Sequence, residues 1–264
     1  MPRMLEGRCA LVTGSTGGLG WTIARHLAGE GCNLVLTGRD EHDRIQEQRR
    51  GLEARYGIRA LYHGADLGDP DAIGAMMGAA ASAFGAVDVL VNNAVVRHFA
   101  PVDAFPVERW DEALAVNLSA AFHTIRLAVP AMRARKFGRI VNMASSYGLF
   151  GTAGRIDYVT TKTALLGLTR AVAMDVIAHD ITCNAICPAT IETPAIARRI
   201  DALAREQGLA REAAVTRYLG DRQPSGRFIG ADNVAALIVF LCSPAGSDIT
   251  GAALPVDGGW TAGR

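Results

Sequence analysis

The stretch CALVTGSTGGLGWTIARHLAGEG, residues 9–31, decides the fold of this chain. It begins with a short apolar run typical of a buried strand, continues through a turn with four glycines, and ends in a helical pattern. Glycines allow a tight turn and a close backbone approach, and a helix N-terminus offers unpaired N–H groups to a pyrophosphate. The stretch therefore predicts a strand, a phosphate-binding loop and a helix. The alternative is a plain strand-to-helix connection, which would need one glycine rather than four.

Strand and helix patterns alternate over the rest of the chain, which favours an α/β fold with a parallel sheet covered by helices on both faces. Pro130 lies inside a long helical pattern and predicts a kink or a break there. The sequence shows no repeat or linker, and 264 residues fit one domain over residues 1–264. Strands are expected at residues 9–14, 33–37, 59–63, 87–91, 138–143, 182–187 and near 254–256, and helices at about 108–135, after 157, at 194–221 and at 231–241.

Composition argues against several classes of partner. The net charge of +1 and the lack of a basic block argue against nucleic acid and anionic membranes. No run approaches transmembrane length and the N-terminus is too polar for a signal peptide, so we expect a soluble, cytoplasmic protein. The five cysteines lie mostly in apolar runs without a CxxC motif, and Cys183 and Cys187 have a strand spacing. We therefore expect buried thiols in a reducing compartment and no metal site.

Residues 142–162, NMASSYGLFGTAGRIDYVTTK, carry the candidate catalytic groups. Tyr158 and Lys162 are four residues apart in a helical pattern and should share one helix face. At ~4 Å and an effective dielectric of ~20, a lysine charge stabilises a phenolate by about 4 kcal/mol. That is enough to bring a tyrosine pKa from ~10 to near 7, where it can exchange a proton with a carbonyl or carbinol oxygen. Ser145 can hydrogen-bond the same oxygen if the strand end faces the helix. Alternatively, Tyr158 and Lys162 are ordinary helix-surface residues.

Together with further motifs, this stretch resembles the short-chain dehydrogenase/reductase family. The motifs, in order, are TGSTGGLG (13–20), Asp66, NNA (92–94), Asn117, Ser145, YVTTK (158–162) and NAICPATIETP (184–194). The resemblance runs from about residue 5 to the end of the chain. It implies a single Rossmann-type domain with a doubly wound, seven-stranded parallel sheet, a nicotinamide cofactor and a homotetramer.

The resemblance also implies roles for individual residues. Tyr158 would be the catalytic acid/base, and Lys162 would lower its pKa and hold the nicotinamide ribose. Ser145 would orient the substrate oxygen, and Asn117 would support a water-linked proton path. The cofactor-binding residues that it implies are Gly14, Ser15, Thr16, Gly18, Leu19, Gly20, Arg39, Asp66, Leu67, Asn93, Ala94, Tyr158, Lys162, Pro188, Ile191 and Thr193.

The end of the second predicted strand bears on the choice between NAD and NADP. A cation there suits the 2′-phosphate of NADP, whereas an acid suits the ribose of NAD. Arg39 favours NADP, although Asp40 or Glu41 could pair with it. Asp66 could accept a hydrogen bond from the adenine amino group or cap the helix after it.

Two residues depart from the family pattern at positions near the cofactor. Val95 stands where the family has the glycine of NNAG, and Ala189 follows Pro188 where the family has another glycine. Val95 adds bulk and tolerates fewer backbone angles than glycine. The cofactor is therefore expected to sit slightly differently or to bind less tightly.

Within the family, the chain is similar to bacterial D-3-hydroxybutyrate dehydrogenases. The similarity rests on YHGADL (62–67), a lid stretch at 198–214 and the ending VDGGWTAGR (256–264), and it implies a helical substrate lid at about 190–225. The positions that clamp a small carboxylate have changed. Arg97 replaces a Gln, Tyr147 a His, Arg155 a Lys, Thr190 a Trp and Arg199 a Gln, whereas His98 is retained.

These changes predict a substrate site with up to three arginines, a residue type that binds carboxylates in a bidentate manner. Asp157 or Glu192 could neutralise the cluster before substrate binds. The alternative for Arg155 and Arg199 is that both are solvated. The sequence therefore predicts an NAD(P)-dependent oxidoreductase that interconverts a hydroxy acid and a keto acid. The alternatives are a 3-oxoacyl thioester reductase and a catalytically silent cofactor-binding protein.

Overall fold

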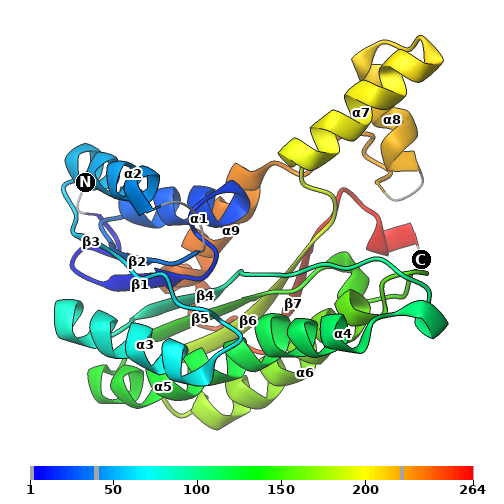
Figure 1. The fold of residues 1–264 in the computed structure, drawn as a ribbon. Helices are drawn as coiled ribbons and strands as arrows, with labels where there is room; N and C mark the ends of the chain where they lie inside the picture. Colours follow the sequence, from blue (N-terminus) through cyan, green and yellow to red (C-terminus); the bar gives the residue numbers. More distant parts are fainter. Residues whose placement is uncertain (1–2, 39–41, 221–222, 264) are drawn as a thin grey trace.

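The computed structural model describes residues 3–38, 42–220 and 223–263. Its centre is a parallel sheet of seven strands in the order β3-β2-β1-β4-β5-β6-β7, drawn in Figure 1. All neighbouring strands run parallel, which confirms the predicted doubly wound sheet. The strands are β1 (Cys9–Val12), β2 (Asn33–Leu36), β3 (Ala60–Tyr62), β4 (Val89–Asn92), β5 (Gly138–Met143), β6 (Ile181–Pro188) and β7 (Ala253–Val256).

Helices cover both faces of this sheet. One face carries α1 (Gly18–Gly29), α2 (His42–Tyr56) and α9 (Ala231–Cys242), and the other carries α3 (Pro70–Phe84), α5 (Ala120–Arg135) and α6 (Ile156–Val176) (Figure 1). Successive strand residues point to opposite faces. Ala10 and Val12 therefore join one core, whereas Cys9 and Leu11 join the other. Because both faces are buried, the strands are apolar at most positions.

All five cysteines are buried and free, as predicted. Burial raises the pKa of the thiols of Cys9, Cys183 and Cys242 to about 12, so they stay protonated at neutral pH.

The helical pattern predicted for residues 108–135 is not one regular helix. It comprises α4 (Val107–Leu114), a π-helical turn at Ala115–Ser119 and α5. Pro130 lies inside α5, which continues past it to Arg135, so of the predicted kink or break the break does not occur. Pro130 is exposed, and water can therefore bond to the carbonyl that its ring leaves without an N–H partner.

The stretch Val107–Arg135 is also long and apolar enough to cross a membrane by length and composition alone. The expectation that no run approaches that length was therefore wrong. Ile125, Ala128 and Met132 of α5 lie in the core between this helix, α3 and the sheet. That packing accounts for the apolar composition.

The predicted lid consists of two helices rather than one helical segment over 194–221. Gly208, with φ +61°, follows α7 (Pro194–Gln207), and α8 (Arg211–Leu219) begins three residues later. Glycine is favoured where a helix ends in this left-handed conformation. In Figure 1, α7 and α8 project from the body beyond the sheet. The lid stretch also includes Asp221 and Arg222, which lie outside the described residues.

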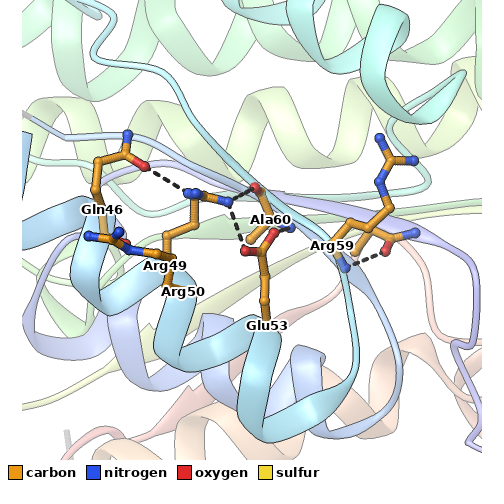
Figure 2. A network of polar contacts seen from close by, with 7 residues as sticks. Gln46, Arg49, Arg50, Glu53, Arg59 and Ala60 are labelled. Carbon is orange, nitrogen blue, oxygen red and sulfur yellow. Dashed lines mark hydrogen bonds and ion pairs between the residues drawn. The ribbon is translucent and has the colours of Figure 1, made fainter.

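A polar network fastens α2 to the β3 edge of the sheet, as Figure 2 shows. Arg49 donates hydrogen bonds to Gln46 at 2.8 Å, to Glu53 at 2.8 Å and to the Ala60 carbonyl at 3.1 Å. Glu53 in turn accepts from the Ala60 N–H at 2.8 Å. The Arg49 guanidinium therefore serves to hold α2 against β3.

Candidate active site

A cleft of about 630 Å³ lies at the carboxyl ends of the strands. It includes the ends of β1 and β4, which are neighbours in the sheet although β2 and β3 separate them in the chain. Chain connections leave for opposite faces at such a switch point, and open α/β sheets bind their ligands there. The cleft is therefore where a dinucleotide is expected.

The glycine loop has the features that a pyrophosphate requires. Gly17 is the N-cap of α1, and no side chain caps that helix. A Cβ added at Gly17 or Gly18 would meet no described atom within 4 Å, so the backbone is open at this point. At Gly20 the same Cβ would lie 2.2 Å from the Gly14 carbonyl oxygen, which explains why only glycine fits there. The loop thus fits a dinucleotide phosphate.

Hydrogen bonds join the ends of β1 and β4 beneath this loop. Thr13 Oγ1 accepts from the backbone N–H groups of Asn93, at 2.8 Å, and Ala94, at 3.0 Å. Asn93 Nδ2 donates to the Thr13 carbonyl at 2.9 Å. These contacts explain why the NNA motif follows this strand.

The structure brings most of the predicted cofactor residues to the cleft. They are Gly14, Thr16, Gly18, Leu19, Gly20, Asp66, Leu67, Asn93, Ala94, Tyr158, Lys162, Pro188, Ile191 and Thr193. Val95 and Ala189, the two departures from the family pattern, line it as well.

Ser15, Asp66 and Arg39 differ from the other predicted cofactor residues or from the roles considered for them. Ser15 does not line the cleft, because its buried Oγ accepts from the Thr37 N–H at 3.1 Å and so ties β1 to β2. Asp66 lines the cleft but does not cap α3, whose N-cap is Asp69. Arg39 lies outside the described residues.

Three predicted catalytic residues meet at the cleft. Tyr158 and Lys162 lie on α6 with their side chains buried, and Ser145 follows β5. Lys162 Nζ lies 5.6 Å from the centroid of the Tyr158 ring and donates to the Met143 carbonyl. The alternative that Tyr158 and Lys162 are ordinary surface residues is therefore wrong.

Electrostatics favour ionisation of Tyr158. Burial raises the pKa of Tyr158, but the charges of Arg97 and Lys162, the Ser145 hydroxyl and the charge of Arg155 together bring it below its ordinary value. Burial lowers the pKa of Lys162 to about 8, against the opposing effect of Tyr158. A tyrosine whose pKa is lowered towards neutrality can accept and return a proton.

Asn117, the fourth predicted catalytic residue, lies in the π-helical turn and does not line the cleft. Its Oδ1 accepts from the Val96 N–H at 2.8 Å, and its Nδ2 donates to the Val96 carbonyl at 3.0 Å and to Thr161 Oγ1 at 3.4 Å. The side chain thus connects the loop after β4 to α6. Its role in a proton path stays a prediction.

The predicted substrate residues divide into two groups. Arg97, Tyr147, Arg155 and Thr190 line the cleft together with Ser145 and Tyr158. Arg199 and His98 do not line it. Arg199 is exposed on α7, and His98 Nε2 lies 3.3 Å from Glu112 Oε2 on α4. Of the up to three arginines predicted to converge, the structure brings Arg97 and Arg155 together, and Arg199 fits the alternative that it is solvated.

Sequence reasoning missed Trp260 as a residue of the cleft. Its buried ring lies 5.1 Å from the Tyr147 ring and 4.7 Å from the Phe150 ring, measured between centroids. It therefore contributes an aromatic wall beside Tyr147, supplied by the end of the chain. An aromatic residue within the otherwise small and polar stretch VDGGWTAGR was the available signal.

Comparisons with known proteins agree with this geometry. The family model described as Enoyl-(Acyl carrier protein) reductase matches residues 14–261. The D-beta-hydroxybutyrate dehydrogenase of Cupriavidus necator is 42% identical over 98% of this chain and 100% of that protein. That of Rhizobium meliloti is 40% identical over 97% of this chain and 99% of its own.

A solved structure agrees as well. The L-sorbose reductase from Gluconobacter frateurii, complexed with NADPH and L-sorbose, superposes with a TM-score of 0.90 at 32% identity over 98% of both chains. The sheet order, the glycine loop and these matches show that the chain belongs to the short-chain dehydrogenase/reductase family and is an NAD(P)-dependent oxidoreductase.

Proposed function

We propose that this protein oxidises the secondary hydroxyl group of a small hydroxy acid, or reduces the corresponding keto acid, with NAD(P). The observation that carries the proposal is the position of Arg97 and Arg155 in the same cleft as Tyr158, Ser145 and Lys162. Guanidinium groups beside the reacting tyrosine suit a substrate with a carboxylate. The names of the two hydroxybutyrate dehydrogenase relatives support a hydroxy acid.

The roles of the residues follow from their positions. When bound, the nicotinamide cofactor supplies or accepts the hydride. Tyr158 takes the hydroxyl proton during oxidation and returns it during reduction. Ser145 hydrogen-bonds the same oxygen, and Lys162 stabilises the phenolate of Tyr158. The arginines hold the carboxylate so that the carbinol carbon has one orientation.

The second candidate is a 3-oxoacyl thioester reductase. The 3-oxoacyl-[acyl-carrier-protein] reductase of Aquifex aeolicus is 32% identical over 97% of this chain. The lid region argues against it, because it contributes Glu192, Thr193, Ile196 and Tyr218 to the cleft, where a long acyl carrier would have to be accommodated.

A substrate panel tests the proposal. We expect 3-hydroxy acids to reduce NAD(P)⁺ with a kcat/KM at least about tenfold above that of neutral secondary alcohols of equal length, since a charged contact contributes ~1.5–3 kcal/mol. Absorbance at 340 nm measures the reaction. Faster turnover of neutral alcohols would contradict the proposal that the substrate carries a carboxylate. Preferential turnover of 3-oxoacyl thioesters would favour the second candidate. Cofactor binding without any turnover would indicate a silent cofactor-binding protein.

We propose NADP as the preferred cofactor. The NADPH bound to L-sorbose reductase supports this choice. Arg39 follows the second predicted strand in the sequence, and its charge would suit a 2′-phosphate. Arg49 is held by Gln46 and Glu53 and would not substitute for it (Figure 2). Arg39→Ala is expected to raise the KM for NADP about tenfold or more and to change the KM for NAD little. Equal changes in both KM values would show that Arg39 does not contact the 2′-phosphate.

We also propose a cytoplasmic homotetramer. Phe122 on α5 and Met174 on α6 are exposed apolar side chains, as is Ile177 at the end of α6, and burial between subunits would remove them from water. Light scattering should give the mass of four chains, whereas a monomer mass at micromolar concentration would contradict this.

A further inference from the structure

Two guanidinium groups flank the ring of Tyr158. Arg155 Cζ lies 4.4 Å from the ring centroid, and Arg97 Cζ lies 5.4 Å from it. The two arginines come from different segments, the loop after β4 and the residue before α6. The backbone joins these segments, because Ala100 pairs with Arg155 and the Ala100 N–H donates to the Gly154 carbonyl at 3.3 Å. The two charges are therefore held at the reacting group by paired backbone.

Neither arginine has a carboxylate partner. Within residues 3–38, 42–220 and 223–263, no acid forms an ion pair with Arg97 or Arg155. Glu192, which was expected to neutralise them, pairs instead with Arg211 of α8. Asp157 is buried, and its Oδ2 accepts from the His98 N–H at 3.2 Å. The charge of Asp157 opposes the lowering of the Arg155 pKa, but neither predicted acid forms an ion pair with Arg97 or Arg155 among these residues.

Arg155 is the inner of the two cations. It is half-buried, and its Nε is buried without a hydrogen-bond partner among the described residues. Its guanidinium carbon also lies 4.6 Å from the Phe99 ring centroid and 5.5 Å from the Tyr147 ring centroid. Aromatic rings stabilise the cation through their faces but accept no strong hydrogen bonds. The Nε–H of Arg155 therefore lacks an acceptor among the described residues.

Arg97 is exposed at the cleft, so its charge costs little when no ligand is bound. Its charge nevertheless acts on the site, because it lowers the pKa of both Tyr158 and Arg155. With Lys162, the site holds three cations around one tyrosine, before counting the positive charge of an oxidised nicotinamide. The Tyr158 phenolate neutralises one of them and a single substrate carboxylate a second, so one cation is left without an anion.

We infer that the substrate is a short hydroxy acid with two carboxylates, one bound by Arg155 inside the cleft and the other by Arg97 at its mouth. This inference rests on the proposed hydroxy acid function and specifies its substrate class. The inner carboxylate provides the acceptor that Arg155 lacks. The outer carboxylate gives discrimination, because a diacid gains a charged contact with Arg97 that a monoacid cannot form.

The test compares 3-hydroxyglutarate with its monomethyl ester, which has nearly the same shape and one charge less. In the wild type, kcat/KM for the diacid should exceed that for the monoester about tenfold or more. Arg97→Gln should bring this ratio to within about threefold of one, and Arg97→Lys should restore part of it. Arg198→Gln removes an exposed lid arginine outside the cleft and should leave the ratio unchanged.

Inhibition by glutarate and by its monomethyl ester provides a readout that does not depend on turnover. Glutarate should be the stronger competitive inhibitor in the wild type and lose that advantage in Arg97→Gln. A wild-type ratio of one or less, with 3-hydroxybutyrate oxidised well, would overturn the two-carboxylate inference and leave the proposed function standing. Oxidation of no hydroxy acid and inhibition by neither glutarate nor its ester would overturn both. A high ratio that persists in Arg97→Gln would overturn the assignment of the second carboxylate to Arg97.

Discussion

Tyr158→Phe is expected to lower kcat about 10²–10⁴-fold while the protein keeps its fold and its affinity for the cofactor. The hydroxyl is the only part that the change removes, and Tyr158 is otherwise held in place by its burial on α6. Without this group, the substrate hydroxyl loses the proton acceptor that the proposed mechanism assigns to it. Steady-state oxidation of a hydroxy acid gives kcat, and quenching of tryptophan fluorescence gives cofactor affinity.

Tyr56→Phe is the matched control, because it removes a tyrosine hydroxyl at the end of α2, away from the cleft. It should retain activity within about twofold, in line with the small effect of most surface changes. Activity of Tyr158→Phe within a few-fold of the wild type would contradict the role assigned to this tyrosine. A matching loss of thermal stability would instead indicate a structural role.

Local patterns predicted most of the fold. The alternation of apolar runs and glycine-containing turns places the strands to within a few residues, and the four-residue spacing of Tyr158 and Lys162 needs only helical geometry. Contacts between segments that are distant in the sequence were harder to predict. The π-helical turn holds Asn117 against the backbone of Val96, and Trp260 reaches Tyr147 from the end of the chain. The sequence around Asn117 carries no signal for the first contact, and the aromatic residue within VDGGWTAGR marks Trp260 without indicating its partner.

The lid is a second case in which the sequence does not predict how distant segments pack. A helical pattern indicates that Arg199 lies on a helix, but not which face of that helix meets the cleft. Arg155 precedes α6 directly and is paired through its backbone with Ala100, so its position follows from the catalytic helix. Arg199 depends on how α7 is placed, and in this structure it is exposed. Arg155 therefore lines the cleft, as positional similarity predicted, whereas Arg199 does not, and the role of Arg155 in substrate binding stays a prediction.

Lys162→Ala is expected to lower alcohol oxidation about 10²-fold near pH 7 and to move the rising limb of its pH profile upward. Oxidation needs Tyr158 as a phenolate, so activity rises as Tyr158 loses its proton. Lys162 is one of the charges that lower the pKa of Tyr158, and its removal raises that pKa. Arg97 and Arg155 remain in the variant and preserve part of the effect.

The pH dependence separates the charge of Lys162 from its other roles. Burial holds the pKa of Lys162 at about 8, so the wild type itself loses this charge at higher pH. The electrostatic difference between wild type and variant should therefore shrink above pH 8 and be greatest below it. The measurement is kcat/KM between pH 6 and 10, with Lys136→Ala, at the only other lysine in the chain, as the control. An equal loss at every pH would show that Lys162 acts through cofactor binding or packing, because neither contribution depends on the ionisation of Tyr158.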